Sequence, residues 1–320
     1  MTTKQAWAGF WLLALIWGSS FLFIRIGVEQ VPPFQLVFLR TGIAAVGLHL
    51  VLALRGQRLP RDWRSRGDLL VLGVVNTVIP FALITWGETR IESGLASVLQ
   101  GTAALFTLVL AHFAFADERV TLRKLAGLLV GFLGVVVLAT RSAAPGGVTS
   151  DAVGHLLGQA AIIGASFCYG LGGIYGRRAM QQRLEPTVVA TGAMTVAAVI
   201  SGAIAWLAPS LGGPAPVGLG QLTPTVLGAV LALGLVNTFG AYLLFYPLVA
   251  TLGATRTSMV TYVIPVVGLL LGALFLGERV DLLLILGALL ILGGIAIVNL
   301  NLAALARWPA RAPVKVAEDG

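Results

Sequence analysis

The sequence predicts an all-α integral membrane protein with ten transmembrane helices, arranged as two inverted five-helix repeats. Three observations lead to this prediction. The composition is too apolar for a protein that faces water, ten apolar runs are long enough to cross a bilayer, and segments half a chain apart are similar to each other.

The composition indicates a lipid environment. Hydrophobic residues make up 58% of the 320 residues, and charged residues make up only 11%. A soluble domain carries about 25% charged residues, so this chain has too few to cover a surface exposed to water. The 40 glycines are typical of membrane helices, because small residues let helices approach closely. The single cysteine, Cys168, excludes a disulfide within the chain and a cysteine-based zinc site.

Ten apolar runs are candidate spans, because a spanning helix needs about 20 mostly apolar residues. The first run is too long for a signal-peptide core and is expected to remain as a helix. The eighth run contains Asn237 and Gly240 and is expected to be bent or tilted. The runs are 7–28, 33–54, 67–89, 92–115, 123–140, 152–176, 186–207, 223–249, 255–276 and 281–302.

Basic residues in the loops predict the orientation. With both termini in the cytoplasm, sixteen of the 21 basic residues fall on the cytoplasmic side and three fall on the other side. Cytoplasmic loops of membrane proteins carry an excess of Lys and Arg, so this orientation is the expected one. The net charge of +8 is then explained by loop charges, and we expect no nucleic-acid partner. The three outer residues are Arg90, Arg141 and Arg279.

An internal repeat divides the chain. Glu-Arg-Val occurs at 118–120 and again at 278–280, an offset of 160, and the following Thr121 and Asp281 are good helix N-caps. Val-Asn-Thr occurs at 75–77 and at 236–238, an offset of 161. Chance similarity between leucine-rich helices is the alternative, and two matches at nearly one offset argue against it. A unit of five helices must be followed by a copy that enters the membrane from the opposite side, which is an architecture common in secondary transporters.

Two segments rich in Gly and Pro, 141–151 and 208–222, interrupt the apolar pattern as linkers do. We therefore expect a first repeat over 1–145, a second repeat over 146–306, and a disordered cytoplasmic tail over 307–320.

Several segments resemble a known family. The sequences at 16–21, 38–40 and 93–97, with the two Glu-Arg-Val triplets, resemble the EamA-type members of the drug/metabolite transporter superfamily over residues 8–302. This resemblance implies a central cavity lined mainly by the first, third, fourth, sixth, eighth and ninth helices. It also implies export of amino acids or similar metabolites. Within the family the chain is similar to exporters of aromatic and other neutral amino acids in bacterial inner membranes.

One departure from symmetry is visible. The fourth helix has Ala104 and Leu105 where the ninth helix has Ile264 and Pro265. Only one half therefore has a proline at that depth, which puts strict functional symmetry in doubt.

Polar and aromatic residues within the lining helices are the candidate substrate-binding residues, because polar groups in hydrocarbon are costly unless they are paired or face a cavity. The asparagine amides could bind a substrate's ammonium or carboxylate group, or they could join helices. The aromatic rings could form a wall that attracts cations, or they could be ordinary packing. The candidates are Trp17, Asn76, Thr77, Phe81, Gln100, Tyr169, Asn237, Tyr242, Thr261 and Tyr262.

Charged residues within or beside the spans have structural interpretations. Arg25 and Glu29 are spaced to pair along one helix. Arg40 is expected to snorkel outward, or to pair with Glu29 or Glu92, rather than to bind substrate. We place Glu29, Glu88 and Glu92 near the outer face, so no acid lies at the centre of a helix. A proton-driven pump usually needs such a group, so this absence favours facilitated diffusion or exchange.

Other functional classes lack their motifs. A Walker A sequence is absent, the three histidines are scattered, and no HExxH or GxSxG pattern occurs, so we expect neither an enzyme nor a cofactor. A lipid-modifying membrane enzyme and a structural subunit are the rivals from other classes. Within transport, a sugar, a nucleotide or a drug is the alternative substrate. Gly127 and Gly131 form a GxxxG pattern that could join helices within one chain or in a homodimer.

Overall fold

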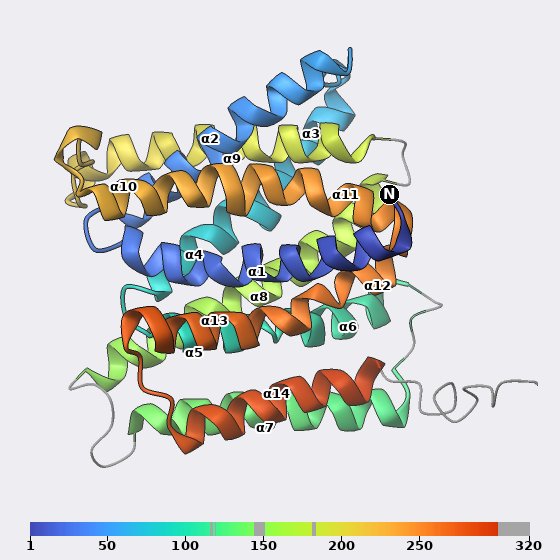
Figure 1. Cartoon of the computed structure of the whole chain (residues 1–320), viewed down its shortest axis with the longest axis vertical. Helices are drawn as coiled ribbons and strands as arrows, with labels where there is room; N and C mark the ends of the chain where they lie inside the picture. Colours follow the sequence, from blue (N-terminus) through green and yellow to red (C-terminus); the bar gives the residue numbers. More distant parts are fainter. Residues whose placement is uncertain (116–117, 119, 144–150, 181–183, 300–320) are drawn as a thin grey trace, which may run out of the picture.

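The computed structural model shows a bundle of long helices that lie side by side (Figure 1). It describes residues 1–115, 118, 120–143, 151–180 and 184–299. Over these residues no strand occurs, and ten helical segments are long and apolar enough to cross a membrane. The prediction of an all-α protein with ten spans is therefore confirmed. Most of the linker predicted at 141–151, and the whole tail at 307–320, fall outside the described residues.

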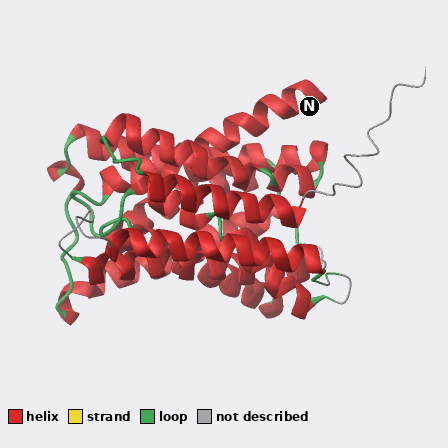
Figure 2. Ribbon diagram, turned by 90° about the horizontal axis from the view of Figure 1, so that it is seen from below, coloured by secondary structure: helices red, strands yellow, loops and turns green. Residues whose placement is uncertain are grey.

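The ten spans are built from continuous and interrupted helices, and Figure 2 shows their ends and connections gathered at two opposite ends of the bundle. Proline begins three of them, which suits the first helical position because proline has no N–H to leave unpaired. In chain order the spans are α1 (Thr3–Gly27); α2 (Pro33–Leu54); α3 (Trp63–Gly73), η1 (Val74–Val78) and α4 (Ile79–Gly87); α5 (Ser93–Gln100) and α6 (Ala103–Ala114); α7 (Leu122–Ala143); α8 (Ala152–Met180); α9 (Pro186–Leu207); α10 (Pro224–Leu231), η4 (Ala232–Gly240) and α11 (Ala241–Leu252); α12 (Ala254–Ser258) and α13 (Val260–Leu276); and α14 (Leu282–Asn299). Two short 3-10 turns, η2 (Ala208–Leu211) and η3 (Leu219–Gln221), lie in the connection before α10.

Two spans contain π-helical segments at the repeated Val-Asn-Thr sequence. η1 contains Asn76 in the third span, and η4 contains Asn237 in the eighth. A π-helical segment breaks the regular spacing of backbone hydrogen bonds and often marks a functional site. The two halves therefore share an irregularity as well as a sequence.

The fourth and ninth spans are both interrupted. The fourth breaks at Gly101 and Thr102, between α5 and α6, and the ninth breaks at Met259, between α12 and α13. Pro265 lies inside α13, beyond that break. The predicted difference in proline content is real, yet the interruption itself occurs in both halves at nearly equivalent positions.

Helix packing follows the repeat. Helix α7 lies against its counterpart α14 at the lower edge of Figure 1, and α2 lies against its counterpart α9 near the upper edge. Helix α1 packs on α13, and the corresponding helix α8 packs on α6. These reciprocal pairings are the ones expected of two units related by a two-fold axis.

The pairing of α7 with α14 depends on glycine. A Cβ atom on Gly294 would lie 2.5 Å from the backbone oxygen of Gly127 and 2.5 Å from the backbone nitrogen of Gly131. Atoms this close would force the helices apart, so small residues permit the contact. The GxxxG pattern thus serves packing within the chain.

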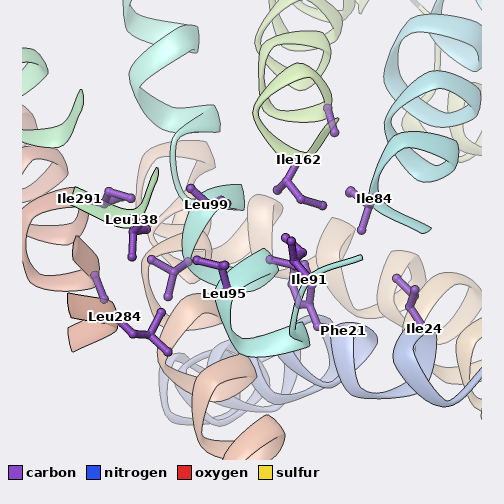
Figure 3. Close-up of a cluster of buried hydrophobic side chains, with 14 of the residues drawn as sticks. Phe21, Ile24, Ile84, Ile91, Leu95, Leu99, Leu138, Ile162, Leu284 and Ile291 are labelled. Carbon is purple, nitrogen blue, oxygen red and sulfur yellow. The ribbon is translucent and has the colours of Figure 1, made fainter. Parts of the chain in front are cut away.

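The largest buried cluster draws on both halves (Figure 3). Phe21 of α1 and Leu95 of α5 pack in one cluster with Ile162 of α8 and Leu284 of α14. Large apolar side chains on the outside of the bundle are instead exposed, for example Leu129, which is 65% exposed. Such a surface would be a liability in water, and it suits contact with lipid.

Candidate functional site: a polar cluster between the two halves

Asn237 joins η4 to α1. Its side-chain Nδ2 donates hydrogen bonds to the backbone oxygen of Ile16 and to Ser19 Oγ, the latter at 3.0 Å. Its Oδ1 is buried without a hydrogen-bond partner. The amide therefore makes the interhelical contact that one of the two interpretations predicted, and it retains one acceptor for another group.

Asn76, the sequence counterpart, has different surroundings. It is half-buried in η1 and faces α8, where a Cβ atom on Gly172 would collide with its side chain. The neighbouring Thr77 is buried, and its hydroxyl has no hydrogen-bond partner. The two asparagines thus occupy equivalent π-helical segments without making equivalent contacts.

Arg40 is buried between the halves, and its side chain is 8% exposed. Its Nε donates a hydrogen bond to Thr238 Oγ1 at 2.8 Å, and its Cζ lies 4.0 Å from the centre of the Phe81 ring. The predicted pairing with Glu29 or Glu92 is wrong, because Glu92 binds Arg141 and Arg40 contacts η4 and α4 instead. The predicted outward snorkelling is also wrong, because the two contacts hold the guanidinium inside the bundle.

Glu88 is the most deeply buried acid in the described part of the chain, with no exposed surface. Both carboxylate oxygens lack a hydrogen-bond partner. Arg25 Nη1 donates to the backbone oxygen of Glu88 at 2.5 Å, rather than to the carboxylate of Glu29 as predicted. The sequence placed Glu88 at the correct end of its helix and missed its burial, because α8 packs along α4 at Gly87 and Arg25 of α1 reaches the backbone of Glu88.

Burial and nearby charges shift the pKa of Glu88. It directly follows the third span, which ends at Gly87. Burial raises the pKa of Glu88 well above its ordinary value, and the negative charge of Glu278 raises it further. Arg25 and Arg40 act in the opposite direction and do not offset the burial. Burial is therefore the strongest influence on the pKa of this acid.

Three aromatic rings lie near the guanidinium of Arg40. Tyr169 of α8 and Tyr242 of α11 lie within electrostatic range of Arg40, and Phe81 lies directly beneath it. Tyr242 stacks on Tyr246, with ring centres 5.9 Å apart. Two of the aromatic candidates, Tyr169 and Tyr242, thus lie near a cation of the protein itself.

The remaining candidates from the sequence lie outside this cluster. Trp17 contacts Phe245 with ring centres 5.5 Å apart. Gln100 is half-buried at the break after α5, with an unpartnered Oε1. Thr261 is exposed and donates to the backbone oxygen of Ser258 in α12, while Tyr262 lies toward Asn299 of α14.

Two sets of contacts join the halves at the end of the bundle that carries Glu92, which we call the Glu92 end. Glu278 Oε1 accepts the N–H of Ser93 at 2.7 Å, and its Oε2 accepts the N–H of Gly94 at 2.8 Å. This carboxylate therefore caps α5 from the other half of the chain, where negative charge is favoured by the helix dipole. From the sequence we predicted only that the residue after each Glu-Arg-Val triplet caps the helix that follows. The cap that Glu278 supplies to α5 was not predicted.

Arg141 forms the second tie. It is 2% exposed and binds Glu92 at 2.7 Å and Asp281 at 2.6 Å. Asp281 also accepts the N–H of Leu284 at 2.8 Å, which confirms it as the N-cap of α14. Burial alone would raise the pKa of Asp281, but the hydrogen bonds from Arg141 and Leu284 lower it. Ion pairs at the Glu92 end therefore join α7 to the starts of α5 and α14.

No metal site is evident in the described residues. They contain no group of three or more His, Cys, Asp or Glu side chains that could hold a metal ion. The arrangement as a whole is a buried cluster of unpaired polar atoms and charges between helices of both halves. Such a cluster is costly in a membrane unless it meets a polar partner there.

Comparison with known proteins gives a consistent result. The sequence profile of the EamA-like transporter family matches residues 6–140 and 156–300. An uncharacterized transporter of Archaeoglobus fulgidus is 28% identical over 92% of this chain and 98% of its own length. A probable amino-acid metabolite efflux pump of Escherichia coli strain K12 is 28% identical over 95% of this chain and 96% of its own. One solved crystal structure aligns with a TM-score of 0.63 at 22% identity, covering 96% of this chain and 100% of the other, which supports the fold alone.

Proposed function

The chain belongs to the EamA-like transporter family, and from that premise we propose that it is a secondary transporter exporting small metabolites, with aromatic or other neutral amino acids as the first candidates. The observation that carries this proposal is the cluster around Arg40 and Glu88, two charges buried between helices with no counter-ion among the described residues in contact. The efflux-pump relative in Escherichia coli supports the choice of amino acids.

The proposed mechanism is alternating access around this cluster. The two five-helix units are inverted relative to each other, as the odd number of helices requires, and they exchange shapes so that the site opens to one side at a time. The ties made by Glu278 and Arg141 close the Glu92 end, which the distribution of basic residues predicts to face outward. Both termini then lie in the cytoplasm of a bacterium, with the chain in the inner membrane.

The driving force is open to direct measurement. The sequence argument against proton coupling was that no acid lies at the centre of a helix, and Glu88, at the end of α4, does not contradict it. Glu88 is nevertheless fully buried, so an acid that could carry a proton is present within the bundle. Exchange, facilitated diffusion and proton coupling are therefore to be separated by flux with and without a pH gradient.

A substrate screen in proteoliposomes tests the proposal. Purified protein should accelerate the flux of at least one neutral amino acid, and empty liposomes should not. Turnover of lipid without any flux of an amino acid, sugar, nucleoside or drug would replace the proposal with the membrane-enzyme alternative. Absence of both activities from folded protein would favour a structural role.

A further inference from the structure

The cluster contains a cation held in a fixed position. Thr238 takes the Nε hydrogen of Arg40, and Phe81 covers one face of the guanidinium. No carboxylate of the described residues lies within ion-pair distance of Arg40. The other guanidinium N–H groups of Arg40 make no hydrogen bond to any described residue. A guanidinium presents paired donors that suit a carboxylate, and here the free donors belong to a buried charge.

The cluster also contains a hydrogen-bond acceptor, the Glu88 carboxylate, that has no donor among the described residues. Glu88 is fully buried, and neither carboxylate oxygen has a hydrogen-bond partner. Arg25, the base that touches this residue, donates to its backbone oxygen. Buried polar groups are nearly always satisfied, so an unsatisfied carboxylate needs a specific explanation.

The two groups lie near each other without touching. Helix α2, which carries Arg40, packs against α4, which ends just before Glu88. Each charge acts electrostatically on the other, yet no ion pair forms between them. A buried charge without a partner is costly, so each of these two groups lacks, among the described residues, the close counter-ion that a buried charge normally has.

We propose that Arg40 and Glu88 bind the two ends of one zwitterion, with the guanidinium taking the substrate's carboxylate and the Glu88 carboxylate taking its ammonium group. This inference rests on the proposed transport function and names the substrate class, which is a free α-amino acid with an uncharged side chain. Such a molecule supplies both missing counter-ions at once. A sugar supplies neither, and a lipophilic cation would leave Arg40 unpaired.

The surroundings fit this class. Phe81, Tyr169 and Tyr242 place aromatic rings near Arg40, and these rings can contact an apolar or aromatic substrate side chain. Both charges come from the first half of the chain. Their counterparts at an offset of 160 are Ile200 and Leu248, so the second half does not repeat the pair.

Three near-isosteric solutes test the inference in proteoliposomes. L-phenylalanine has both charged groups, L-phenylalaninamide lacks the carboxylate, and 3-phenylpropionate lacks the ammonium group. Each is measured as a competitor of labelled L-phenylalanine uptake, alongside a hexose, a nucleoside and a quaternary ammonium dye. For the wild type we expect each truncated analogue to compete about ten- to a hundredfold more weakly than L-phenylalanine, because each leaves a charged hydrogen bond unmade.

The variants assign each end. In Arg40→Gln, L-phenylalaninamide should compete as well as L-phenylalanine, while 3-phenylpropionate should still compete more weakly. In Glu88→Gln, 3-phenylpropionate should compete as well as L-phenylalanine, while the amide should still compete more weakly. A purely structural role would weaken all three solutes together. Glu29→Gln and Arg90→Gln remove exposed charges at the same end and should leave the ratios unchanged.

The outcomes separate the two proposals. If both variants still transport and compete with the three solutes in the same ratios as the wild type, the zwitterion inference is overturned. Wild-type transport of the hexose, nucleoside or dye without transport of any amino acid would also overturn it. In either case the protein would still be a transporter. If both variants abolish flux, binding of the three solutes to purified protein is compared by thermal shift, and equal loss for all three counts against the inference. No flux of any solute by folded wild-type protein would overturn the transport function and the inference with it.

Discussion

Arg25 donates a hydrogen bond to the backbone oxygen of Glu88, 63 residues further along the chain, and so leaves the carboxylate of Glu88 unpaired. This contact fixes the end of α4 against α1 while the acid itself has no partner inside the bundle. The arrangement explains why Glu88 is sensitive to pH and why we place it in the substrate site.

The pH dependence of stability follows from that burial. The pKa of Glu88 is raised above its ordinary value of 4.5, with Glu278 adding to the effect and Arg25 and Arg40 opposing it. Its neutral form therefore contributes stability that is fully present below pH 4.5 and is lost as pH rises through the raised pKa. The loss accumulates at about 1.4 kcal/mol per pH unit.

The variant Glu88→Gln has no group that can ionise at this position, so the pH dependence of its Tm is compared with that of the wild type. We expect the Tm of the purified wild type to fall relative to that of Glu88→Gln as the pH is raised from about 5 to about 8. A constant difference in Tm across this range would mean that Glu88 does not titrate in the folded protein.

The cap supplied by Glu278 should be worth more than the pair made by its repeat counterpart. Glu278→Ala removes the acceptor of two backbone N–H groups at the start of α5 and should cost about 1–2 kcal/mol of stability. Glu118→Ala removes only exposed contacts to Lys124 at 3.9 Å and Arg177 at 3.4 Å, and should cost less than about 1 kcal/mol. Chemical denaturation in detergent checks both, and equal losses would contradict the cross-half cap.

Two adjacent glycines of α14 provide a matched test of the α7 contact. Gly294→Ala places a methyl group 2.5 Å from the backbone of α7 and should destabilise the protein by about 1–3 kcal/mol. Gly293→Ala meets nothing within 4 Å and should be neutral or slightly stabilising. Similar Tm values for the two variants would show that the helices are not closely packed there.

The two asparagines should differ in what they do. Asn237→Ala removes donors to Ile16 and Ser19 of α1, so it should lower both folded yield and uptake. Asn76→Ala loses only packing against Gly172 and should impair uptake with a normal yield. Gel filtration and flux measurements on the two variants check this, and normal transport by Asn76→Ala would remove that residue from the site.

The fold was largely predictable because its signals are long and repeated. Ten apolar runs and a five-helix repeat define spans and pairings without knowledge of side-chain geometry. The breaks in the fourth and ninth spans were not predictable, because the break at Gly101 and Thr102 has no proline to mark it.

The site was predictable only in part. Asn237, Phe81, Tyr169 and Tyr242 were chosen because polar and aromatic residues stand out within apolar runs. Glu88 was missed because a residue at the end of a span is expected to meet water, and only tertiary packing shows that it does not. The partners of Arg40 lie 198 residues away in Thr238 and in a ring on another helix, which sequence spacing cannot reveal. The one sequence feature that could have pointed to the burial of Glu88 is its position immediately after Trp86 and Gly87, close to the end of an apolar span.

Counterflow is the measurement that tests the central claim most directly. Proteoliposomes are loaded with unlabelled neutral L-amino acids, and labelled L-phenylalanine is added outside in a trace amount. The account predicts a transient accumulation of label that is abolished by excess L-phenylalanine and spared by 3-phenylpropionate. Folded protein that produces no accumulation with any neutral amino acid, or whose accumulation 3-phenylpropionate blocks equally well, would contradict it.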